Sequence, residues 1–458
     1  MQTWLDENLA RLIGKYDVPA ASIAVLADGV VSEAAAGVLN QNTGVEATTD
    51  AIFQVGSITK LWTTTLIMQL VAEGKVELDR PVRDYLPEFK LADEVASAAV
   101  TPRHLLTHTG GFSGDAFTPT SRGDDGVELY VRDVVPGLVQ EVPLGAGFSY
   151  NNAGFVILGR IAEVLRGKPY HELLREQIAA PLELTHVATI PDEALLHRVA
   201  LGHISPTPGA PLQAAPQWSL VHAMAPAGSL LAMSARDLIA FGRGYLDATL
   251  LDRAAVDSLW EPQVDVPRIG GMAEQWGLGW VIFDGSLYGH DGGTIGQSAY
   301  FRLVPDKGVA VALLTNGGDT PALYDELVGH VLRETTGVEL PKRPVPPSEP
   351  VEISPDLVTG RYDGVLLRVT VSVEDGELWV LDEAASDEAK VLLPEPRRTR
   401  FVALDESRLI AAEPEHGVHD VIAFREPVDG RATYLFRGGR LTPVVTDRSY
   451  RQLAKVVA

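Results

Sequence analysis

Cysteine is absent from the 458-residue sequence. Disulfide bonds, thiolate nucleophiles and zinc sites built on cysteine are therefore excluded. Basic residues are also scarce, because 38 lysines and arginines stand against 61 aspartates and glutamates and give a formal net charge of −23. Nucleic acids and anionic membranes bind basic protein surfaces. We therefore expect neither a nucleic acid nor a membrane as a partner.

Long apolar runs are missing as well. No run of apolar residues approaches the length that spans a bilayer. The N-terminal segment, Met1–Glu7, lacks the basic stretch and apolar core of a secretory signal. These absences predict a cytoplasmic protein, but a secreted chain trimmed of its leader would have the same sequence. The sequence leaves the oligomeric state open.

The length and the proline pattern predict two domains. Apolar residues make up 46% of the chain and charged residues 22%, which is typical of folded proteins. A chain of 458 residues is too long for one ordinary core. Prolines crowd the segment 341–355, as in extended linkers. We therefore predict domains at residues 1–340 and 357–458, joined by a linker at residues 341–356.

The first predicted domain mixes helices with antiparallel strands. Apolar spacing and turn residues predict helices at 4–16, 155–165 and 321–335 and strands at 20–26, 30–36, 276–283, 298–304 and 308–314. The first two strands form a hairpin, which favours an antiparallel sheet over a series of parallel strands. The predicted fold class is therefore α+β, with the sheet flanked by helices.

The second predicted domain has a simpler pattern. Leu367, Val369, Val371 and Val373 alternate with polar residues, and similar short apolar runs recur up to residue 436. Strict alternation is typical of strands with one buried face. The pattern predicts a small antiparallel barrel or sandwich. It shows no group of residues with an evident catalytic role.

Ser57 and Lys60 are the first candidate catalytic residues. They stand three residues apart at the start of an apolar run from Leu61 to Ala72, so both side chains lie on one face if the segment is helical. A serine hydroxyl needs a base to become a nucleophile, and a desolvated lysine can be that base. The N–H groups at the helix start can stabilise an oxyanion. The alternative is that Ser57 only caps the helix.

His104 and His108 have the spacing of two zinc ligands on a helix. No glutamate follows the first histidine, and no third ligand is evident. Helix packing beside the Gly110–Gly111 turn explains them better. We therefore expect no metal site and no cofactor.

Three short segments follow one another along the chain: Ser57-Ile58-Thr59-Lys60, Tyr150-Asn151-Asn152 and His290-Asp291-Gly292-Gly293-Thr294. The three together resemble the motifs of the serine β-lactamase and penicillin-binding-protein superfamily, closest to its class C-like branch. The flanking segment Trp276-Gly277-Leu278-Gly279-Trp280 is similar as well. The resemblance covers about residues 1–338 and implies a β-lactamase/transpeptidase-like sheet with a helical subdomain.

The resemblance implies a role for each catalytic candidate. Ser57 would be acylated, and Lys60 would hold it and help to deprotonate it. Tyr150 would act as general base, as a phenolate or through a shared proton, and then protonate the leaving group. That role would require the Lys60 ammonium to lower the pKa of Tyr150 from about 10.

The resemblance also implies the substrate-binding residues. Asn152 would hydrogen-bond the amide on the acyl side of the substrate. The oxyanion would lie between the backbone N–H groups of Ser57 and Gly293, with Gly292 and Thr294 beside it. Water attack would then release the acyl group.

His290 departs from the β-lactamase pattern, which has lysine at this place. Histidine is mostly neutral at pH 7 and attracts a substrate carboxylate less than lysine does. A histidine there is familiar in esterases and D-aminopeptidases of the branch. We therefore expect a serine hydrolase for small esters, amides or short peptides, including peptides with D-amino acids. A weak β-lactamase is an alternative.

The C-terminal domain keeps a second function open. Barrel or lipocalin-like domains are familiar in D-aminopeptidases of the branch and in penicillin-binding-protein-type thioesterases that cyclise peptides. An acyltransferase or cyclase would use the same acyl-serine with an amine as acceptor. A non-catalytic scaffold of the same fold is the remaining alternative, although Ser57, Lys60 and Tyr150 are all present.

Overall fold

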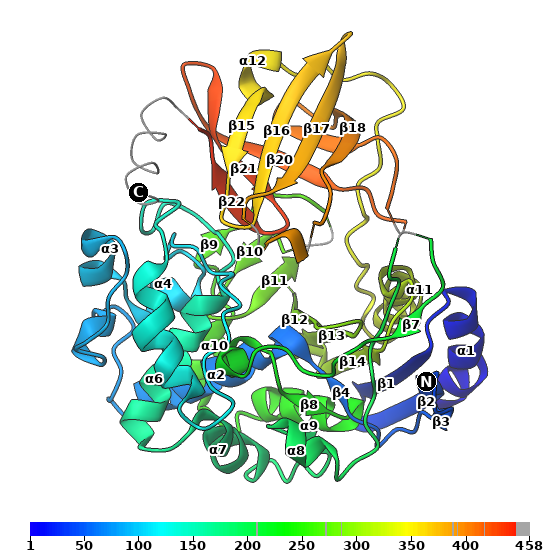
Figure 1. The fold of residues 1–458 in the computed structure, drawn as a ribbon. Coiled ribbons are helices and arrows are strands. Elements are labelled where there is room, and N and C mark those ends of the chain that lie inside the picture. Colours follow the sequence, from blue (N-terminus) through cyan, green and yellow to red (C-terminus); the bar gives the residue numbers. More distant parts are fainter. Residues whose placement is uncertain are drawn as a thin grey trace.

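The computed structural model describes residues 1–207, 209–270, 273–284, 286–386, 389–391, 393–415 and 417–445. Within these residues, nine strands form one sheet in the order β3-β2-β1-β14-β13-β12-β11-β10-β9 (Figure 1). Every neighbouring pair in this sheet is antiparallel, as predicted. The strands are β1 (Ala20–Ala27), β2 (Val30–Asn40), β3 (Val45–Glu46), β9 (Val264–Asp265), β10 (Gln275–Trp276), β11 (Val281–Asp284), β12 (Leu287–Gly293), β13 (Ser298–Val304) and β14 (Val309–Thr315).

Helices cover both faces of this sheet, because its central strands are apolar on both sides. Successive side chains of a strand point to opposite faces. Ala24 and Ala312 accordingly belong to the apolar cluster that includes helices α2 and α9. Ile23 and Val311 belong to a second cluster with helices α1 and α11. The covering helices are α1 (Gln2–Lys15), α2 (Thr59–Ala72), α9 (Ala235–Leu246) and α11 (Thr320–Thr336).

A helical subdomain lies beside the sheet and is centred on helix α6 (Asn152–Arg166), which α2, α4, α5 and α7 contact (Figure 1). The apolar residues of α6 from Phe155 to Leu158, together with Ile161 and Ala162, are fully buried. The other helices of this part of the chain are α3 (Glu94–Ala99), α4 (Pro102–Leu106), α5 (Gly126–Leu129), α7 (Tyr170–Leu174), α8 (Pro191–Ala194) and α10 (Arg253–Leu259). No helix among the described residues is both long and apolar enough to cross a bilayer.

One predicted strand is wrong. Residues 276–283 form a hairpin, because β10 ends at Trp276 and β11 begins at Val281. Gly279 has φ +75°, a conformation that residues with a side chain rarely adopt, and the backbone N–H of Gly277 donates to the carbonyl of Trp280. The two glycines therefore make a turn where the apolar pattern predicts continuous pairing.

The C-terminal part is an antiparallel barrel, as predicted. Its eight strands within the described residues follow one another in chain order, and a bridge between Tyr362 and Val444 brings the last segment back to the first (Figure 1). Residues 446–458 of the predicted second domain lie outside the described residues. The strands are β15 (Gly360–Asp363), β16 (Leu367–Glu374), β17 (Glu377–Ala384), β18 (Arg397–Ala403), β19 (Arg408–Ala411), β20 (Val421–Val428), β21 (Arg431–Arg437) and β22 (Arg440–Pro443).

The barrel and the first part of the chain share apolar contacts. Phe148 and Trp276 belong to the same buried cluster as Phe436 and Leu441 of the barrel. Residues 341–354 between the two parts form no regular helix or strand. A short helix, α12 (Pro355–Val358), leads into the barrel. The exact division into domains stays a prediction.

Candidate active site

Ser57 lies where the chain turns from strand β4 (Phe53–Gln54) through the 3₁₀ turn η1 (Gly56–Ile58) into helix α2. The prediction that a helix begins near Ser57 is therefore confirmed, with one tight turn before the α-helix. Gly56 has φ +51°, and a Cβ on it would stand 2.6 Å from the backbone nitrogen of Gly293. A side chain at residue 56 would push the strand that carries Gly293 away from Ser57.

Lys60 is fully buried, and its amine contacts Ser57. Nζ lies 3.0 Å from Oγ of Ser57, 2.7 Å from Oδ1 of Asn152 and 2.6 Å from the carbonyl oxygen of Ala227. Burial lowers the pKa of Lys60 well below its ordinary value. The shift favours the neutral amine, which has two N–H groups and a lone pair; in that form the oxygens of Asn152 and Ala227 can accept the two N–H groups. The lone pair is then left for the hydroxyl proton of Ser57.

Tyr150 approaches Ser57 from the loop before α6. Its hydroxyl hydrogen-bonds Ser57, its ring stacks on His108 with centroids 4.3 Å apart, and the Lys60 amine lies 4.9 Å from the ring centroid. Complete burial raises the pKa of Tyr150 despite the bond to Ser57. The expectation of a lowered pKa for Tyr150 is therefore wrong, because the effect of burying the phenol outweighs its hydrogen bond to Ser57. Tyr150 keeps its proton in the free protein.

Asn152 is the first residue of helix α6, not part of the loop before it. Asn151 takes the capping position, where its side chain accepts from the N–H of Gly154 at 2.8 Å. The Asn152 amide links a basic side chain, Lys60, to an acidic one, Asp115. Its oxygen accepts from Lys60, and its nitrogen donates to Oδ1 of Asp115 at 2.7 Å.

His290 lies within strand β12 and is buried. Its Nδ1 is 2.6 Å from the carbonyl oxygen of Asp291, and Nε2 has no hydrogen-bond partner among the described residues. Burial, with a smaller effect of nearby Lys60, lowers the pKa of His290 to about 3. The imidazole is therefore neutral at physiological pH, as predicted from the residue type.

The end of β12 passes directly against the Ser57 turn. A Cβ on Gly292 would stand 1.8 Å from the carbonyl oxygen of Val55 and 3.1 Å from the backbone nitrogen of Ser57. Gly293 follows at the exposed end, where a Cβ would meet nothing within 4 Å. The hydroxyl of Thr294 is buried without a partner among the described residues. The backbone N–H groups of Ser57 and Gly293 thus lie on neighbouring segments beside the nucleophile.

We expect Gly292→Ala to abolish this arrangement. The new methyl group would overlap the Val55 carbonyl and separate β12 from the Ser57 turn. Loss of an oxyanion donor alone costs about a hundredfold or more in rate. The rate of covalent labelling of Ser57 measures the effect. Gly137→Ala is the matched control, since its Cβ would meet nothing within 4 Å; equal labelling of both variants would contradict the prediction.

The two candidate zinc histidines serve different parts of the fold. His104 belongs to the cap of helix α4, where its Nδ1 lies 2.8 Å from the Thr101 hydroxyl. His108 is fully buried under Tyr150, and its Nδ1 accepts from the backbone N–H of Asn151 at 2.9 Å. His108 therefore positions the loop that carries Tyr150.

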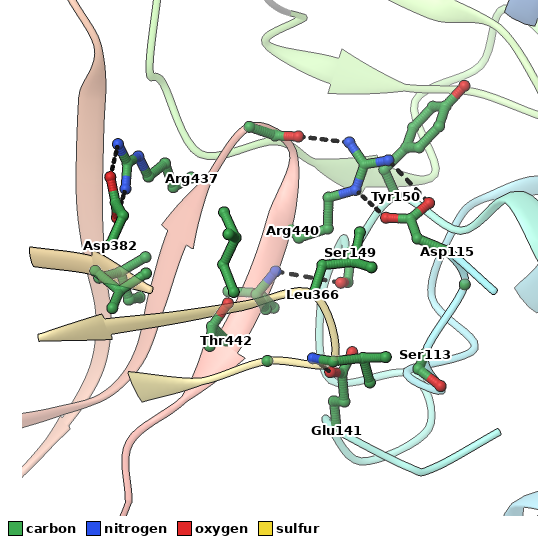
Figure 2. A pocket seen from close by; sticks show the side chains of 18 of the residues that line it. Ser113, Asp115, Glu141, Ser149, Tyr150, Leu366, Asp382, Arg437, Arg440 and Thr442 are labelled. Atoms are coloured by element: carbon green, nitrogen blue, oxygen red, sulfur yellow. Dashed lines mark hydrogen bonds and ion pairs between the residues drawn. The ribbon is translucent and has the colours of Figure 1, made fainter. Parts of the chain in front are cut away.

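Sequence reasoning missed Asp115 and Arg440. Asp115 follows the Gly110–Gly111 turn, and Arg440 begins barrel strand β22. The Arg440 guanidinium contacts both Asp115 oxygens, with Nε 2.9 Å from Oδ2 and Nη2 3.1 Å from Oδ1 (Figure 2). It also lies 4.9 Å from the Tyr150 ring centroid. No local pattern marks either residue, because their contact depends on how the barrel docks.

A cavity of about 550 Å³ lies between the barrel and the first part of the chain (Figure 2). Tyr150 and Asp115 line it from one side, whereas Leu366 and Thr442 line it from the barrel. Ser57 and Lys60 are not among its lining residues. The cavity therefore lies behind Tyr150 and Asp115 as seen from the nucleophile.

A serine with a buried lysine as base, and with a tyrosine brought in from another loop, defines a serine hydrolase of the β-lactamase type. Residues 5–333 match the Beta-lactamase family model, and the chain belongs to this family, within the serine β-lactamase and penicillin-binding-protein superfamily. The resemblance in the sequence is thereby confirmed. Penicillin-binding protein 4 from Amycolatopsis lactamdurans is 40% identical over 369 residues, which cover 78% of this chain and 96% of that protein.

Two solved structures are similar to this one to different extents. The crystal structure of SurE has a TM-score of 0.78 and 27% identity, over 97% of this chain and 99% of that chain. D-amino acid amidase from Ochrobactrum anthropi SV3, complexed with L-phenylalanine amide, has a TM-score of 0.59 and 26% identity, over 69% of this chain and 90% of that chain. Similarity to SurE therefore includes nearly the whole chain, barrel included.

Proposed function

We propose that the protein hydrolyses small esters or amides, including short peptides with D-amino acids, through an acyl-enzyme on Ser57. The contact between Lys60 Nζ and Ser57 Oγ at 3.0 Å carries this proposal. A base within hydrogen-bonding range is what turns a serine into a nucleophile. The hydrolase membership of the family supports the same reaction class.

Acylation follows from the arrangement of the side chains. Neutral Lys60 takes the hydroxyl proton as Ser57 Oγ attacks the substrate carbonyl. The backbone N–H groups of Ser57 and Gly293 stabilise the negative oxygen of the tetrahedral intermediate. Tyr150 gives its proton to the leaving oxygen or nitrogen as the bond to the carbonyl carbon breaks, and it regains a proton from protonated Lys60. Water then attacks the ester of Ser57 in the reverse sense and releases the acid.

The neutral state of His290 supports substrates without an obligatory carboxylate. An imidazole with a pKa of about 3 provides no positive charge for such a group. Burial also lowers the pKa of Lys60 and raises the pKa of Tyr150, which disfavours the charged form of both groups. Amides and esters fit this environment better than β-lactams that depend on a carboxylate. The similarity to D-amino acid amidase from Ochrobactrum anthropi SV3 supports amides as one substrate class.

The barrel favours a second candidate, acyl transfer to an amine. It contacts the Tyr150 loop, since the backbone N–H of Tyr150 donates to the Gly439 carbonyl at 2.8 Å. A domain placed there can limit access of water to an acyl-serine and hold a second substrate. A peptide ester incubated with and without a competing amine would decide. Cyclic or amine-coupled product supports transfer, and free acid alone excludes it.

Covalent labelling tests the proposed function. An alkyl phosphonate ester should add one group to Ser57, detected by intact mass and by peptide mapping. Ser57→Ala should take up no label. Ser258→Ala is the matched control, because Ser258 is also partly exposed but lies on helix α10, and it should label normally. Labelling at another residue, or unchanged ester turnover by Ser57→Ala, would refute the proposal and favour a non-catalytic scaffold.

A further inference from the structure

The barrel reaches the active site through the hairpin of strands β21 and β22. Gly438 and Gly439 form its tip, and both have positive φ angles. The tip is fixed to the loop that carries Tyr150 by two hydrogen bonds. Tyr150 N–H donates to the Gly439 carbonyl at 2.8 Å, and Leu441 N–H donates to the Ser149 hydroxyl at 3.2 Å. Arg440 is therefore held at a defined place between these two bonds.

An unbroken series of polar contacts leads from Arg440 to the nucleophile. The guanidinium binds the Asp115 carboxylate in a two-point ion pair, which is the strongest geometry for this pair of groups. Asp115 accepts from the Asn152 amide at 2.7 Å. Asn152 in turn accepts from the Lys60 amine at 2.7 Å, and Lys60 lies 3.0 Å from Ser57 Oγ.

We propose that Arg440 is a positioning residue for the catalytic base: it holds Asp115, and through Asp115 and Asn152 it sets the orientation and charge state of Lys60. The proposal rests on the proposed function, because it needs Lys60 to act as a base. It gives the barrel a part in the reaction that does not depend on contact between barrel and substrate. Arg440 and Asp115 touch no reacting atom and act only through their neighbours.

After burial, which has the largest effect on the pKa of Lys60, Arg440 and Asp115 are the charged groups that act on it. His108 and His290 face the lysine and are neutral, because burial lowers the pKa of both. Tyr150 is neutral because burial raises its pKa. Asp291, the next acidic residue on β12, is ion-paired with Arg302 at 2.5 Å.

Arg440 and Asp115 act on Lys60 in opposite directions. The positive charge of Arg440 lowers the pKa of Lys60, and the negative charge of Asp115 raises it. Paired, the two charges offset one another while the hydrogen bonds through Asn152 are kept. Loss of either partner should therefore shift the pKa of Lys60, and the direction of the shift should depend on which partner is lost.

Two single variants test this directly in the full-length chain. In Arg440→Gln the unpaired Asp115 carboxylate favours protonated Lys60. The acid limb of the pH–rate profile for acylation, where the rate falls as Lys60 becomes protonated, should therefore have its midpoint at higher pH. In Asp115→Asn the unpaired guanidinium disfavours protonated Lys60, so the limb should move to lower pH. We expect the two midpoints to differ by about one pH unit, the scale of a nearby buried charge. Phosphonate labelling of Ser57, followed from about pH 5 to about pH 10, gives each midpoint.

The double variant and a neighbouring arginine are the controls. Arg440→Gln combined with Asp115→Asn removes both charges and should return the midpoint toward that of the wild type. Arg437 lies in the same hairpin and is ion-paired with Asp382 at 2.5 Å, so Arg437→Gln disturbs the barrel without breaking the contacts to Lys60. Arg437→Gln should leave the midpoint unchanged. Circular dichroism verifies that each variant is folded.

Different results separate this inference from the proposed function. Coincident midpoints for Arg440→Gln, Asp115→Asn and the wild type would overturn the inference, while wild-type labelling at Ser57 would leave the proposed function standing. A higher KM with an unshifted pH limb would also overturn it, since that result marks Arg440 as a substrate contact. If Arg440→Gln fails to fold, Arg440→Lys is the second variant, because it keeps the charge and weakens the two-point contact with Asp115. It should lower the rate of Ser57 labelling several-fold without moving the midpoint of the pH profile. An unchanged labelling rate would overturn the inference.

Discussion

Lys60→Ala is expected to reduce the rate of acylation by about two to four orders of magnitude, the usual contribution of an acid–base partner. The amine that faces Ser57 at 3.0 Å would be gone, and among the described residues Lys60 is the basic side chain that contacts this hydroxyl. Single-turnover kinetics with an activated ester would measure the acylation step apart from deacylation. A loss under about tenfold in that step would contradict the role of Lys60 as base.

A fold defect must be separated from this catalytic defect. Lys60→Met is a suitable second variant, because it nearly preserves the volume of the fully buried side chain and removes only the amine. Both variants should lose activity to a similar degree if the amine is what matters. Lys75→Ala is the surface control, since the Lys75 amine pairs with Glu73 at 2.9 Å on the exposed side of the protein; it should retain full activity.

Tyr150→Phe is expected to lose about two to four orders of magnitude as well, and the loss should depend on the leaving group. Tyr150 keeps its proton because burial raises its pKa. Its hydroxyl can therefore donate that proton where the leaving group departs. Alkyl esters and amides need this proton more than a nitrophenyl ester does. The ratio of acylation rates for the two kinds of substrate measures the effect.

Tyr170 provides the matched control for Tyr150. It is also a buried tyrosine whose pKa burial raises, and its hydroxyl lies 2.7 Å from Thr63, one helical turn beyond Lys60. Tyr170 lies on helix α7, so Tyr170→Phe removes a buried hydroxyl that contacts helix α2 without touching Ser57. We expect it to stay within a few-fold of the wild-type rate. Equal losses in both variants, or a Tyr150→Phe defect that ignores the leaving group, would refute the assignment.

Local patterns predicted most of the fold. Alternation of apolar residues marked the strands on either side of the turns at 27–29 and 305–308, and the sheet pairs them as expected. The barrel followed from the same period of two. The break between Trp276 and Val281 was missed because its glycines stand within an apolar run, and apolarity alone does not separate a strand from a buried turn.

The candidate site was predictable to the extent that its residues fall in short motifs. Ser57 and Lys60 are linked by helical spacing, which the structure confirms as a contact. The directions of the pKa shifts were not predictable, because they depend on the complete burial of Lys60 and Tyr150. Asp115 and Arg440 stand 325 positions apart, and only the docking of the barrel brings them together.

The buried apolar cluster that joins the barrel to the first part of the chain limits how such proteins can be recombined. Phe148 and Trp276 pack with Phe436 and Leu441, so neither lobe has a complete apolar surface of its own. A chimera that takes its barrel from a relative must bring a matching surface as well as a guanidinium at the hairpin. Substitutions on the two sides of this contact are therefore expected to be selected together.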